Sequence, residues 1–332
     1  MRAAWYERQG PARDVLVVGT MPDPEPAPGE VRMRVAVSGV NPGDIKKRQD
    51  AFDYGMPFPR VIPHSDGAGT IDKVGAGVPQ DRVGERVWCY GAQAYRPFGT
   101  AAEYVVVPSS QAVRLADAVP FEQGACLGIP GITAHRAVHV AAPVSGRVVL
   151  VQGGTGAVAS CAVGLARLAG ARVLATVRSN AEASAAREAG AHEVIECGGR
   201  PAEAVVKEIF ALSPSGVDHI VEVAFSANIA TDIEVLANGG SLATYATGSA
   251  TPSIPFWPLV FKNVRIFFLG SDDFPSEAKV EAARGINALL EARWPGFKIE
   301  ERFTLADIAQ AHERLETRRG TGRVVLLIDP RN

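Results

Sequence analysis

The chain has 332 residues, of which 47% are hydrophobic and 21% charged, and its formal net charge is −2. This length favours two domains, and the composition is that of a globular protein. The small net charge and the absence of a long basic run argue against nucleic acid or an anionic membrane as a partner. No apolar run reaches membrane-spanning length, and the first residues do not resemble a signal peptide, so a cytoplasmic location is expected.

The four cysteines lie far apart in the sequence, at Cys89, Cys126, Cys161 and Cys197. No C-x-x-C pair occurs, so the sequence indicates neither a zinc lobe nor a disulfide framework. We expect small core or surface residues in a reducing compartment.

Residues 1 to about 120 predict a domain of short β-strands. The strands are expected over Arg2–Tyr6, Val15–Gly19, Glu30–Gly39, Gly67–Val74, Glu85–Tyr90 and Thr100–Val107. Turn-forming residues separate them, and regularly spaced short strands favour a small barrel or sandwich. The polar, aromatic and proline-rich insert from Asn41 to Pro63 predicts a helix and a loop at one edge of that barrel.

From Phe121 to about Arg136 the pattern is helical, and strands then alternate with helices. The expected strands are Val148–Gln152, Arg172–Val177, Glu193–Glu196, Val217–Ala224, Ser241–Ala246 and Val264–Leu269. The expected helices are Gly156–Ala169, Ala181–Ala189, Pro201–Leu212 and Ile229–Leu236. Six strands with crossover helices predict a doubly wound parallel sheet, the α/β class of fold.

The last segment predicts two helices and a strand, over Ser276–Ala292, Leu305–Glu316 and Arg323–Ile328. We expect this segment to return to the first domain. The predicted division is therefore a β-domain over residues 1–120, a doubly wound domain over 121–270 and a return segment over 271–332.

A glycine-rich loop follows the first strand of the predicted parallel sheet. Gly154-Thr155-Gly156-Ala157-Val158-Ala159 fits G-x-G-x-x-G/A between a strand and a helix. The first glycine permits a tight turn, the second lets the backbone approach a pyrophosphate, and the small third position allows close helix packing. The positive end of the helix dipole then faces the phosphates. The pattern favours dinucleotide binding over a glycine turn that is only structural.

The end of the next strand indicates which cofactor binds. An NAD site usually has Asp or Glu here to hold the ribose 2′-hydroxyl. This chain has Val177-Arg178-Ser179-Asn180, and an arginine with hydroxyl and amide neighbours suits a 2′-phosphate. NADPH is therefore favoured over NADH. The alternative is that Arg178 is solvated and that Ser179 or Asn180 caps the following helix.

The order of these parts resembles the medium-chain dehydrogenase/reductase superfamily, in particular its zinc-free, zeta-crystallin-like quinone oxidoreductases. The resemblance covers nearly the whole chain. Its motifs are Gly39-Val40-Asn41-Pro42, Pro63-His64-Ser65-Asp66-Gly67-Ala68-Gly69, Gly124–Ala134, Gly153–Val158 and Gly320-Thr321-Gly322-Arg323-Val324-Val325-Leu326. It implies a GroES-like barrel joined to a Rossmann domain.

The resemblance also implies roles for individual residues. Asn41 and Thr133 would lie near the nicotinamide, and Tyr245, Ala246, Thr247, Gly270 and Ser271 would line its cleft. The pyrophosphate would lie on Gly153, Gly154, Thr155, Gly156, Ala157 and Val158. Three positions depart from the family: Lys46 and Cys197 stand where tyrosines occur, and Glu182 stands where a lysine occurs.

Zinc is not expected. In the zinc alcohol dehydrogenases of this superfamily a catalytic cysteine occupies the place of Asn41, and His64 is followed here by Ser65 and Asp66. One histidine without thiolates does not hold zinc, because a catalytic site keeps three protein ligands.

Four further residues are candidates for the substrate pocket, namely Asp44, Lys46, Tyr54 and His64. His64 could form a polar wall, bond to Asp66 or serve as a structural turn residue. The charged run that holds Asp44 and Lys46 could equally be a solvated helix face. Tyr54, with Phe52 and Phe58, could form an aromatic rim for a planar substrate or fill a loop core.

The expected activity is NADPH-dependent reduction of quinones or related α,β-unsaturated carbonyls, without metal or flavin, by hydride transfer in a cleft between the domains. No compelling general acid is evident, so the last proton would come from solvent. The alternatives are an enoyl or alkenal reductase and a crystallin-like NADPH-binding protein with little turnover. A homodimer or homotetramer is expected.

Overall fold

The computed structural model describes residues 1–317, 320 and 322–328. Thr321, which belongs to the last family motif, and the end of the predicted return segment lie outside the described residues. The chain forms two compact units, unit 1 from residues 1–129 and 297–332 and unit 2 from residues 130–296.

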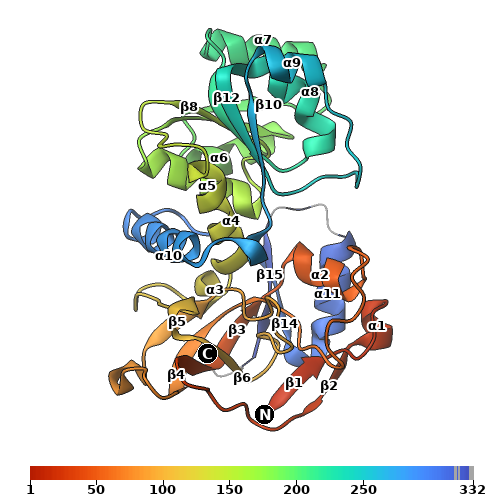
Figure 1. Ribbon diagram of the computed structural model, residues 1–332, viewed down its shortest axis with the longest axis vertical. Helices are drawn as coiled ribbons and strands as arrows, with labels where there is room; N and C mark the ends of the chain where they lie inside the picture. Colours follow the sequence, from red (N-terminus) through yellow and green to blue (C-terminus); the bar gives the residue numbers. More distant parts are fainter. Residues whose placement is uncertain (318–319, 321, 329–332) are drawn as a thin grey trace. The chain divides into compact units, whose positions relative to one another are not determined.

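Unit 1 is built on a seven-stranded sheet in the order β14-β15-β3-β4-β5-β7, with β6 paired to β3 (Figure 1). A separate pair, β1 and β2, is antiparallel. The strands are β1 (Arg2–Trp5), β2 (Val17–Thr20), β3 (Glu30–Gly39), β4 (Asp66–Val74), β5 (Arg86–Cys89), β6 (Tyr104–Pro108), β7 (Ala112–Arg114), β14 (Ile299–Thr304) and β15 (Arg323–Leu327). The returning strand β15 pairs antiparallel with β3, with Val325 opposite Gly39.

Short helices join these strands. They are α1 (Ala12–Val15), α2 (Pro42–Arg48), η1 (Gln80–Arg82), η2 (Ser109–Gln111), α3 (Phe121–Gly124), η5 (Leu305–Asp307) and α11 (Ile308–Thr317). The core lies against alternate residues of the long strands, including Met33 and Val35 of β3, Ile71 of β4 and Leu326 of β15. Burial alternates along the first half of β3, as in a half-buried antiparallel strand, and is continuous from Val35 to Gly39.

Unit 2 contains a six-stranded parallel sheet in the order β10-β9-β8-β11-β12-β13. The strands are β8 (Val148–Val151), β9 (Arg172–Val177), β10 (Glu193–Glu196), β11 (Val217–Glu222), β12 (Leu236–Thr244) and β13 (Arg265–Phe268). The central strand β8 pairs parallel with β9 on one side and with β11 on the other. The strand order therefore reverses between β8 and β11, where doubly wound folds bind ligands at the carboxyl ends of the strands.

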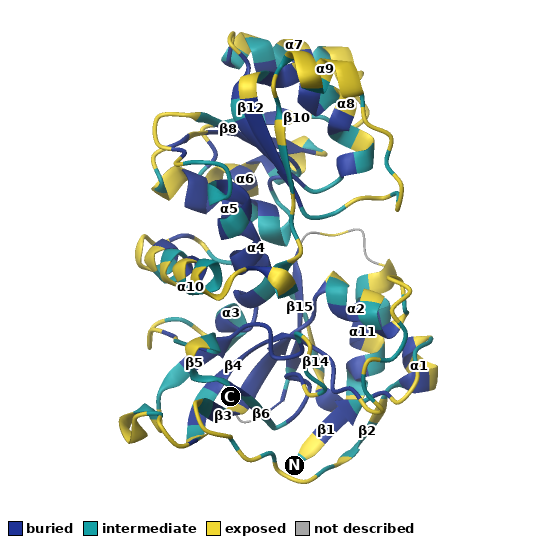
Figure 2. Ribbon diagram, viewed as in Figure 1, coloured by how far each residue is buried: buried dark blue, intermediate teal, exposed yellow. Residues whose placement is uncertain are grey.

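Helices connect the strands of this sheet. They are α4 (Gly128–His139), α5 (Ala157–Leu168), η3 (Asn180–Glu182), α6 (Ala183–Ala189), α7 (Ala202–Leu212), α8 (Phe225–Val235), α9 (Phe256–Phe261), η4 (Ser271–Asp273) and α10 (Ser276–Glu291). Figure 2 shows the middle strands of the sheet as buried and α9 as largely exposed. Leu150 of β8, Leu174 of β9 and Ile220 of β11 belong to one core cluster with residues of α7 and α8.

The unit boundaries differ from the predicted ones, which fell after residues 120 and 270. The first falls later because α3 packs on β3, β4 and β5 of unit 1. The second falls later because α10 packs on α5: a Cβ at Gly164 would lie 3.0 Å from Leu289 and 2.9 Å from Trp294. Residues 271–296 therefore belong to the doubly wound unit.

Apart from the short 3-10 helices, four described elements were not predicted from the sequence, and each is short or exposed. α1 occupies Ala12–Val15, so that the strand expected from Val15 begins at Val17 instead. β7 has three residues and α9 has six. β14 is an edge strand whose burial alternates only weakly, and its charged residues hide the strand pattern.

Candidate functional site

The glycine loop lies between the end of β8 and the start of α5, at the reversal of strand order. Gly153 has a φ of +66°, a conformation that glycine adopts without steric cost. Its N–H donates to Thr176 Oγ1 at 3.0 Å, and the N–H of Gly154 donates to the carbonyl of Thr176 at 2.8 Å. The loop is thus anchored to β9, and its sharp turn is at Gly153 rather than at Gly154.

The other two glycines are explained by different neighbours. A Cβ at Gly154 would lie 2.8 Å from the Cβ of Ala175, so this position must stay small for the loop to pack on β9. Gly156 has a φ of −65°, and a Cβ there would meet only the Gly153 carbonyl, at 3.4 Å. Neither backbone conformation nor packing within the described chain requires glycine at position 156. The space beside it suits a ligand that approaches the backbone.

Helix α5 begins at this space. Its N-cap residue is Gly156, which has no side chain to cap the helix, and Ala157 and Val158 form its first turn. Ala159 is buried, as the small third position of the motif requires. Uncapped N–H groups and the positive end of a twelve-residue helix favour an anion. Gly156 and this helix start therefore fit the pyrophosphate of a dinucleotide.

A buried polar network supports the loop from below. Thr176 donates through its hydroxyl to Gln152 Oε1 at 2.6 Å, and Gln152 Nε2 donates to Asp232 Oδ1 at 2.7 Å. Asp232 is fully buried next to Glu222, and burial, with the nearby Glu222 carboxylate, raises the pKa of Asp232 well above its usual value. The hydroxyl that holds Gly153 is therefore itself oriented by Gln152, directly after β8, and through it by Asp232 on α8.

Sequence reasoning missed this network because its members come from segments far apart in the sequence: the turn after β8, β9, β11 and α8. One local pattern could have indicated it: Asp232 lies between the buried apolar residues Ile229 and Ile233 on α8. A carboxyl group among buried positions needs a partner.

Arg178 follows β9, as expected, but it has a close partner. Its Nη2 donates to Glu182 Oε1 at 2.8 Å, while its side chain is 60% exposed and that of Glu182 20%. Glu182 Oε2 also accepts from the N–H of Arg178 at 3.1 Å and from Thr155 Oγ1 at 3.3 Å. Ser179 precedes η3 without a side-chain cap bond. The structure thus brings Thr155, Arg178 and Glu182 together beside the loop.

A hollow of about 400 Å³ lies at the carboxyl ends of β12 and β13. Tyr245, Ala246 and Gly270, which the resemblance assigns to the nicotinamide cleft, all line it. Phe225 and Phe268 add an aromatic wall, with ring centroids 5.4 Å apart. The hydroxyl of Tyr245 is buried and has no hydrogen-bond partner among the described residues. The volume is in the range of small-molecule sites.

Asn41 is held by its neighbours in unit 1. Its N–H donates to Asp44 Oδ2 at 2.8 Å, its Nδ2 donates to Asp66 Oδ2 at 2.6 Å, and its Oδ1 accepts from Arg323 Nη2 at 2.8 Å. Asp66 also accepts from the N–H of Ile129. Burial raises the pKa of Asp66 to about 7. The carboxyl group of Asp66 and the guanidinium of Arg323 therefore fix the orientation of the Asn41 side chain.

His64 lies inside unit 1, in a chain of hydrogen bonds whose direction is determined. Arg48 can only donate, so its Nε–H bonds to Nδ1 of His312, at 3.3 Å. The proton of neutral His312 is then on Nε2 and is donated to His64 Nε2 at 2.9 Å. His64 Nδ1 donates in turn to Ser38 Oγ at 2.9 Å.

The chain ends on a backbone acceptor. Ser38 bonds to Thr100 Oγ1 at 2.7 Å, and Thr100 donates to the carbonyl of Asp66 at 2.6 Å. Burial lowers the pKa of His64 to about 3 and that of His312 well below its usual value, so both rings are neutral at pH 7. His64 has a φ of +76° and bonds to neither carboxylate oxygen of Asp66. This arrangement favours the structural interpretation of His64 over a polar pocket wall.

The remaining pocket candidates lie in different environments. Asp44 is buried and caps α2 through the N–H of Asn41. Lys46 and Tyr54 are exposed, with Lys46 Nζ 5.8 Å from the ring centroid of Phe52. The rings of Phe52 and Tyr54 are tilted by 31° with centroids 5.8 Å apart, whereas Phe58 packs on a small core cluster. Thr133 is buried on α4, in unit 2.

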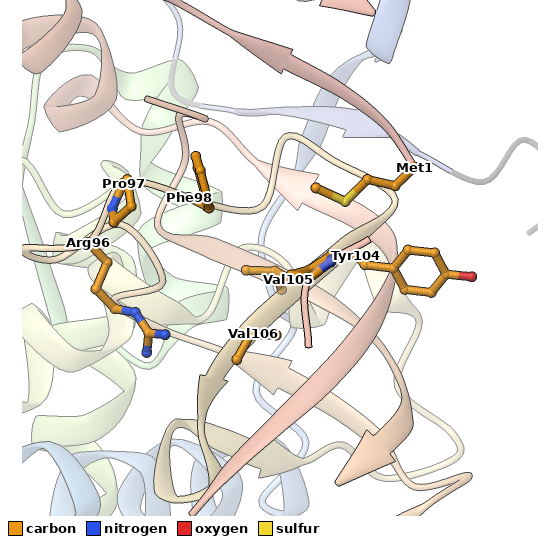
Figure 3. Close-up of a pocket in the computed structure, with 8 residues that line it drawn as sticks. Met1, Arg96, Pro97, Phe98, Tyr104, Val105 and Val106 are labelled. Atoms are coloured by element: carbon orange, nitrogen blue, oxygen red, sulfur yellow. The ribbon is translucent and has the colours of Figure 1, made fainter. Parts of the chain in front are cut away.

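A second hollow, in unit 1, is lined in part by Arg96, Phe98 and Tyr104 (Figure 3). Its volume is about 90 Å³, too small for a substrate of quinone size. Neither hollow is lined by Asp44, Lys46, Tyr54 or His64.

Within the described residues, no group of three or more His, Cys, Asp and Glu side chains could hold a metal ion. In the same part of the chain, no helix has the length and apolar character needed to cross a membrane.

Two family models match the chain: residues 27–117 match the alcohol dehydrogenase GroES-like domain, and residues 157–282 match the zinc-binding dehydrogenase family. A quinone oxidoreductase of Mus musculus is 31% identical over 309 residues, which cover 92% of this chain and 91% of that protein. The chain belongs to the quinone oxidoreductase branch of the medium-chain dehydrogenase/reductase superfamily. It is therefore an oxidoreductase, as the sequence predicts.

Solved structures agree with this assignment. The mycobacterial Rv1454c protein complexed with NADPH has a TM-score of 0.83 at 26% identity, covering 99% of this chain and 100% of that one. An NAD-dependent alcohol dehydrogenase has the same score, identity and coverage. These neighbours confirm the predicted combination of a GroES-like domain with a Rossmann sheet. They support a nicotinamide cofactor, and their names differ on which one.

Proposed function

We propose that this protein reduces quinones or related α,β-unsaturated carbonyls with NADPH, without a metal ion. The observation that carries the proposal is Gly156, a glycine for which the fold itself gives no reason, at the uncapped start of α5. A dinucleotide pyrophosphate accounts for it. The names of the relatives supply the class of acceptor.

The residues of unit 2 would hold the cofactor. Gly156, Ala157 and Val158 would meet the pyrophosphate, and Arg178 would pair with the 2′-phosphate. The hollow lined by Tyr245, Ala246 and Gly270 would take the nicotinamide end. The bound nicotinamide supplies the hydride. The protein's part is to orient the cofactor and to exclude water around it.

The proton that completes the reduction comes from solvent in this proposal. The buried histidines do not serve, because His64 and His312 are neutral and each ring nitrogen already has a partner. The hydrogen bonds of this chain all point the same way, from the donor Arg48 to the backbone carbonyl of Asp66. Hydride transfer to a quinone leaves a hydroquinone monoanion, which needs one further proton and can take it from water.

We also propose that the protein is a homo-oligomer that associates through α9 and β13. β13 ends the described order of the sheet, so one backbone edge has no described neighbour. Trp257, Phe261 and Phe268 are 63%, 74% and 70% exposed on these elements. An edge strand beside an exposed apolar face is suited to pairing with a second copy about a twofold axis.

Steady-state turnover with a panel of quinones, enones and enoyl thioesters, each with NADPH, tests the activity. Turnover of quinones at rates well above those of the other acceptors is expected. Preference for enoyl substrates would transfer the chain to the enoyl or alkenal reductases, and tight NADPH binding without turnover would identify a binding protein. Light scattering of the wild type and of Phe261→Ser tests the association, which the variant should weaken.

A further inference from the structure

The carboxylate of Glu182 is fixed beside the glycine loop. It accepts from Thr155 Oγ1 at 3.3 Å, from the N–H of Arg178 at 3.1 Å and from Arg178 Nη2 at 2.8 Å. Glu182 is 20% exposed, whereas the arginine is 60% exposed. The carboxylate is therefore a fixed feature of the site, and the guanidinium faces solvent.

This pair combines groups that suit two different cofactors. An NAD site presents a carboxylate near the end of the second strand, which accepts from the ribose 2′-hydroxyl. A 2′-phosphate instead requires a cation, and the guanidinium of Arg178 can supply it. The strand end itself has no acid, but the carboxylate of Glu182 in η3, four residues after Arg178, contacts the loop.

We propose that Glu182 is a specificity-determining residue that narrows the preference for NADPH over NADH. This inference rests on the proposed use of NADPH. A 2′-phosphate that pairs with Arg178 meets a second anion already bonded to the same guanidinium, so the two compete and repel each other. The 2′-hydroxyl of NADH carries no charge and can donate to the Glu182 carboxylate. Wild-type protein should therefore bind both cofactors, with a modest preference for NADPH.

An ordinary surface ion pair between residues i and i+4 would have no such effect. Two contacts distinguish Glu182 from such a pair. Its second oxygen accepts from a backbone N–H at the end of β9, and it also bonds to Thr155 within the loop. These hydrogen bonds fix the carboxylate in position, so it stays close to where the cofactor would bind.

Calorimetric titration of NADPH and NADH into wild type and Glu182→Gln tests the proposal. The variant keeps one of the two acceptor oxygens and nearly the same shape but removes the charge. The ratio of the NADH to the NADPH dissociation constant should rise about tenfold, the size of one charge-assisted interaction. Glu188→Gln is the matched control, because Glu188 lies on α6, bonds to Ser184 at 2.8 Å and carries the same charge. Its ratio should equal that of the wild type.

An unchanged ratio in Glu182→Gln, or an equal loss of affinity for both cofactors, would overturn the role of Glu182 and leave the proposed function standing. A wild type that binds neither dinucleotide would overturn both. If Glu182→Gln fails to fold in thermal unfolding, Glu182→Asp replaces it, since the shorter side chain withdraws the carboxylate from Arg178. A smaller rise in the ratio is then expected, and an unchanged or lower ratio contradicts the proposal.

Discussion

The polar groups of two regions differ: those of the buried histidine chain in unit 1 and those around the glycine loop in unit 2. In unit 1, Arg48, His64 and His312 are buried and joined in one hydrogen-bonded chain that runs in a single direction. In unit 2, the loop at Gly156 leaves the start of α5 without a side-chain cap, and Arg178 is 60% exposed.

The difference separates structural from ligand-binding polarity. A buried polar group whose donors and acceptors are all paired has nothing left to offer a ligand, and removing one partner leaves another unsatisfied. A helix start without a side-chain cap, beside a glycine that the fold does not need, has N–H groups that can still bind a ligand. The motif histidine at position 64 belongs to the first kind and the glycine at position 156 to the second.

Gly156→Val tests the ligand-binding region and should have the largest effect. Its φ of −65° suits any residue, so the variant should fold, but the branched side chain fills the space for the pyrophosphate. We expect NADPH affinity to fall by at least about a hundredfold, because several charge-assisted bonds are lost together. Calorimetry measures the binding, and circular dichroism checks the fold.

Gly153→Ala is the comparison variant, since its main effect should be on the turn that anchors the loop to β9. Its φ of +66° strains any other residue, at a cost of about 1 kcal/mol or more in stability. The two variants should therefore divide stability from binding. Normal NADPH binding by Gly156→Val would contradict the assignment of the loop, and Gly156→Ala is the milder substitute if the valine variant does not fold.

Arg48→Met tests the buried chain of unit 1, in which the polar groups are paired. Arg48 is fully buried, bonds to His312, and also donates to the carbonyl of Gly10 and to Glu316. Methionine keeps much of the apolar volume but leaves these acceptors unpaired, so we expect a loss of about 3 kcal/mol in unfolding free energy. Urea unfolding measures it. NADPH affinity should stay within about twofold of the wild type, and a large change in it would contradict a purely structural role.

Much of the fold could be predicted because its elements are regular. β3, β9 and β10 match their predicted bounds, since apolar or alternating residues bounded by turns define them locally. β14 could not be predicted, because an edge strand with Glu300, Glu301 and Arg302 lacks a buried face that would impose alternation.

The site divides in the same way. The glycine loop is a local pattern, so its place between a strand and a helix was predictable. The network beneath it joins Gln152 to Thr176 and to Asp232, which are 24 and 80 residues away in sequence. Likewise, nothing in the spacing of Arg178 and Glu182 distinguishes a surface pair from one that also bonds to Thr155. Such contacts depend on how elements pack, which composition and periodicity do not report.

Arg178→Ala should weaken NADPH binding by about 10- to 100-fold, equivalent to about 1.5–3 kcal/mol for a charge-assisted pair with phosphate. NADH affinity should change little, because the lost group faces no charge on that cofactor. Titration of both cofactors measures the effect, with Arg187→Ala on α6 as the control for net charge. Equal losses for NADPH and NADH would contradict the role of Arg178 at the 2′-phosphate.

The buried histidines should make unfolding sensitive to acid. The folded-state pKa of His64 is lowered to about 3 and that of His312 is lowered too, whereas both are near 6.5 when unfolded. Below pH 6.5 these two side chains bind more protons in the unfolded chain, so their contribution to stability should fall by up to about 1.4 kcal/mol per pH unit for each histidine, down to pH 3 for His64. Asp66 acts in the opposite direction below pH 7, because burial raises its folded-state pKa to about 7. Urea unfolding between pH 8 and 4 measures the slope. His312→Gln should reduce it, and an equal slope in that variant would show that other groups cause the effect.

Treatment with a metal chelator should leave quinone turnover unchanged, which is the smallest expected effect. It tests the paired polar groups around Asn41, His64 and Asp66. A catalytic zinc site needs three protein ligands with free lone pairs. Here Asn41 Oδ1 accepts from the cationic Arg323, both ring nitrogens of His64 are engaged, and Asp66 is already bonded to two N–H donors. A cation would have to displace these bonds and lie close to a guanidinium. Elemental analysis of the purified protein, with quinone turnover before and after chelation, measures the outcome. Stoichiometric zinc together with chelator-sensitive turnover would mean that these side chains rearrange to bind metal. The contrast between the two regions would then fail.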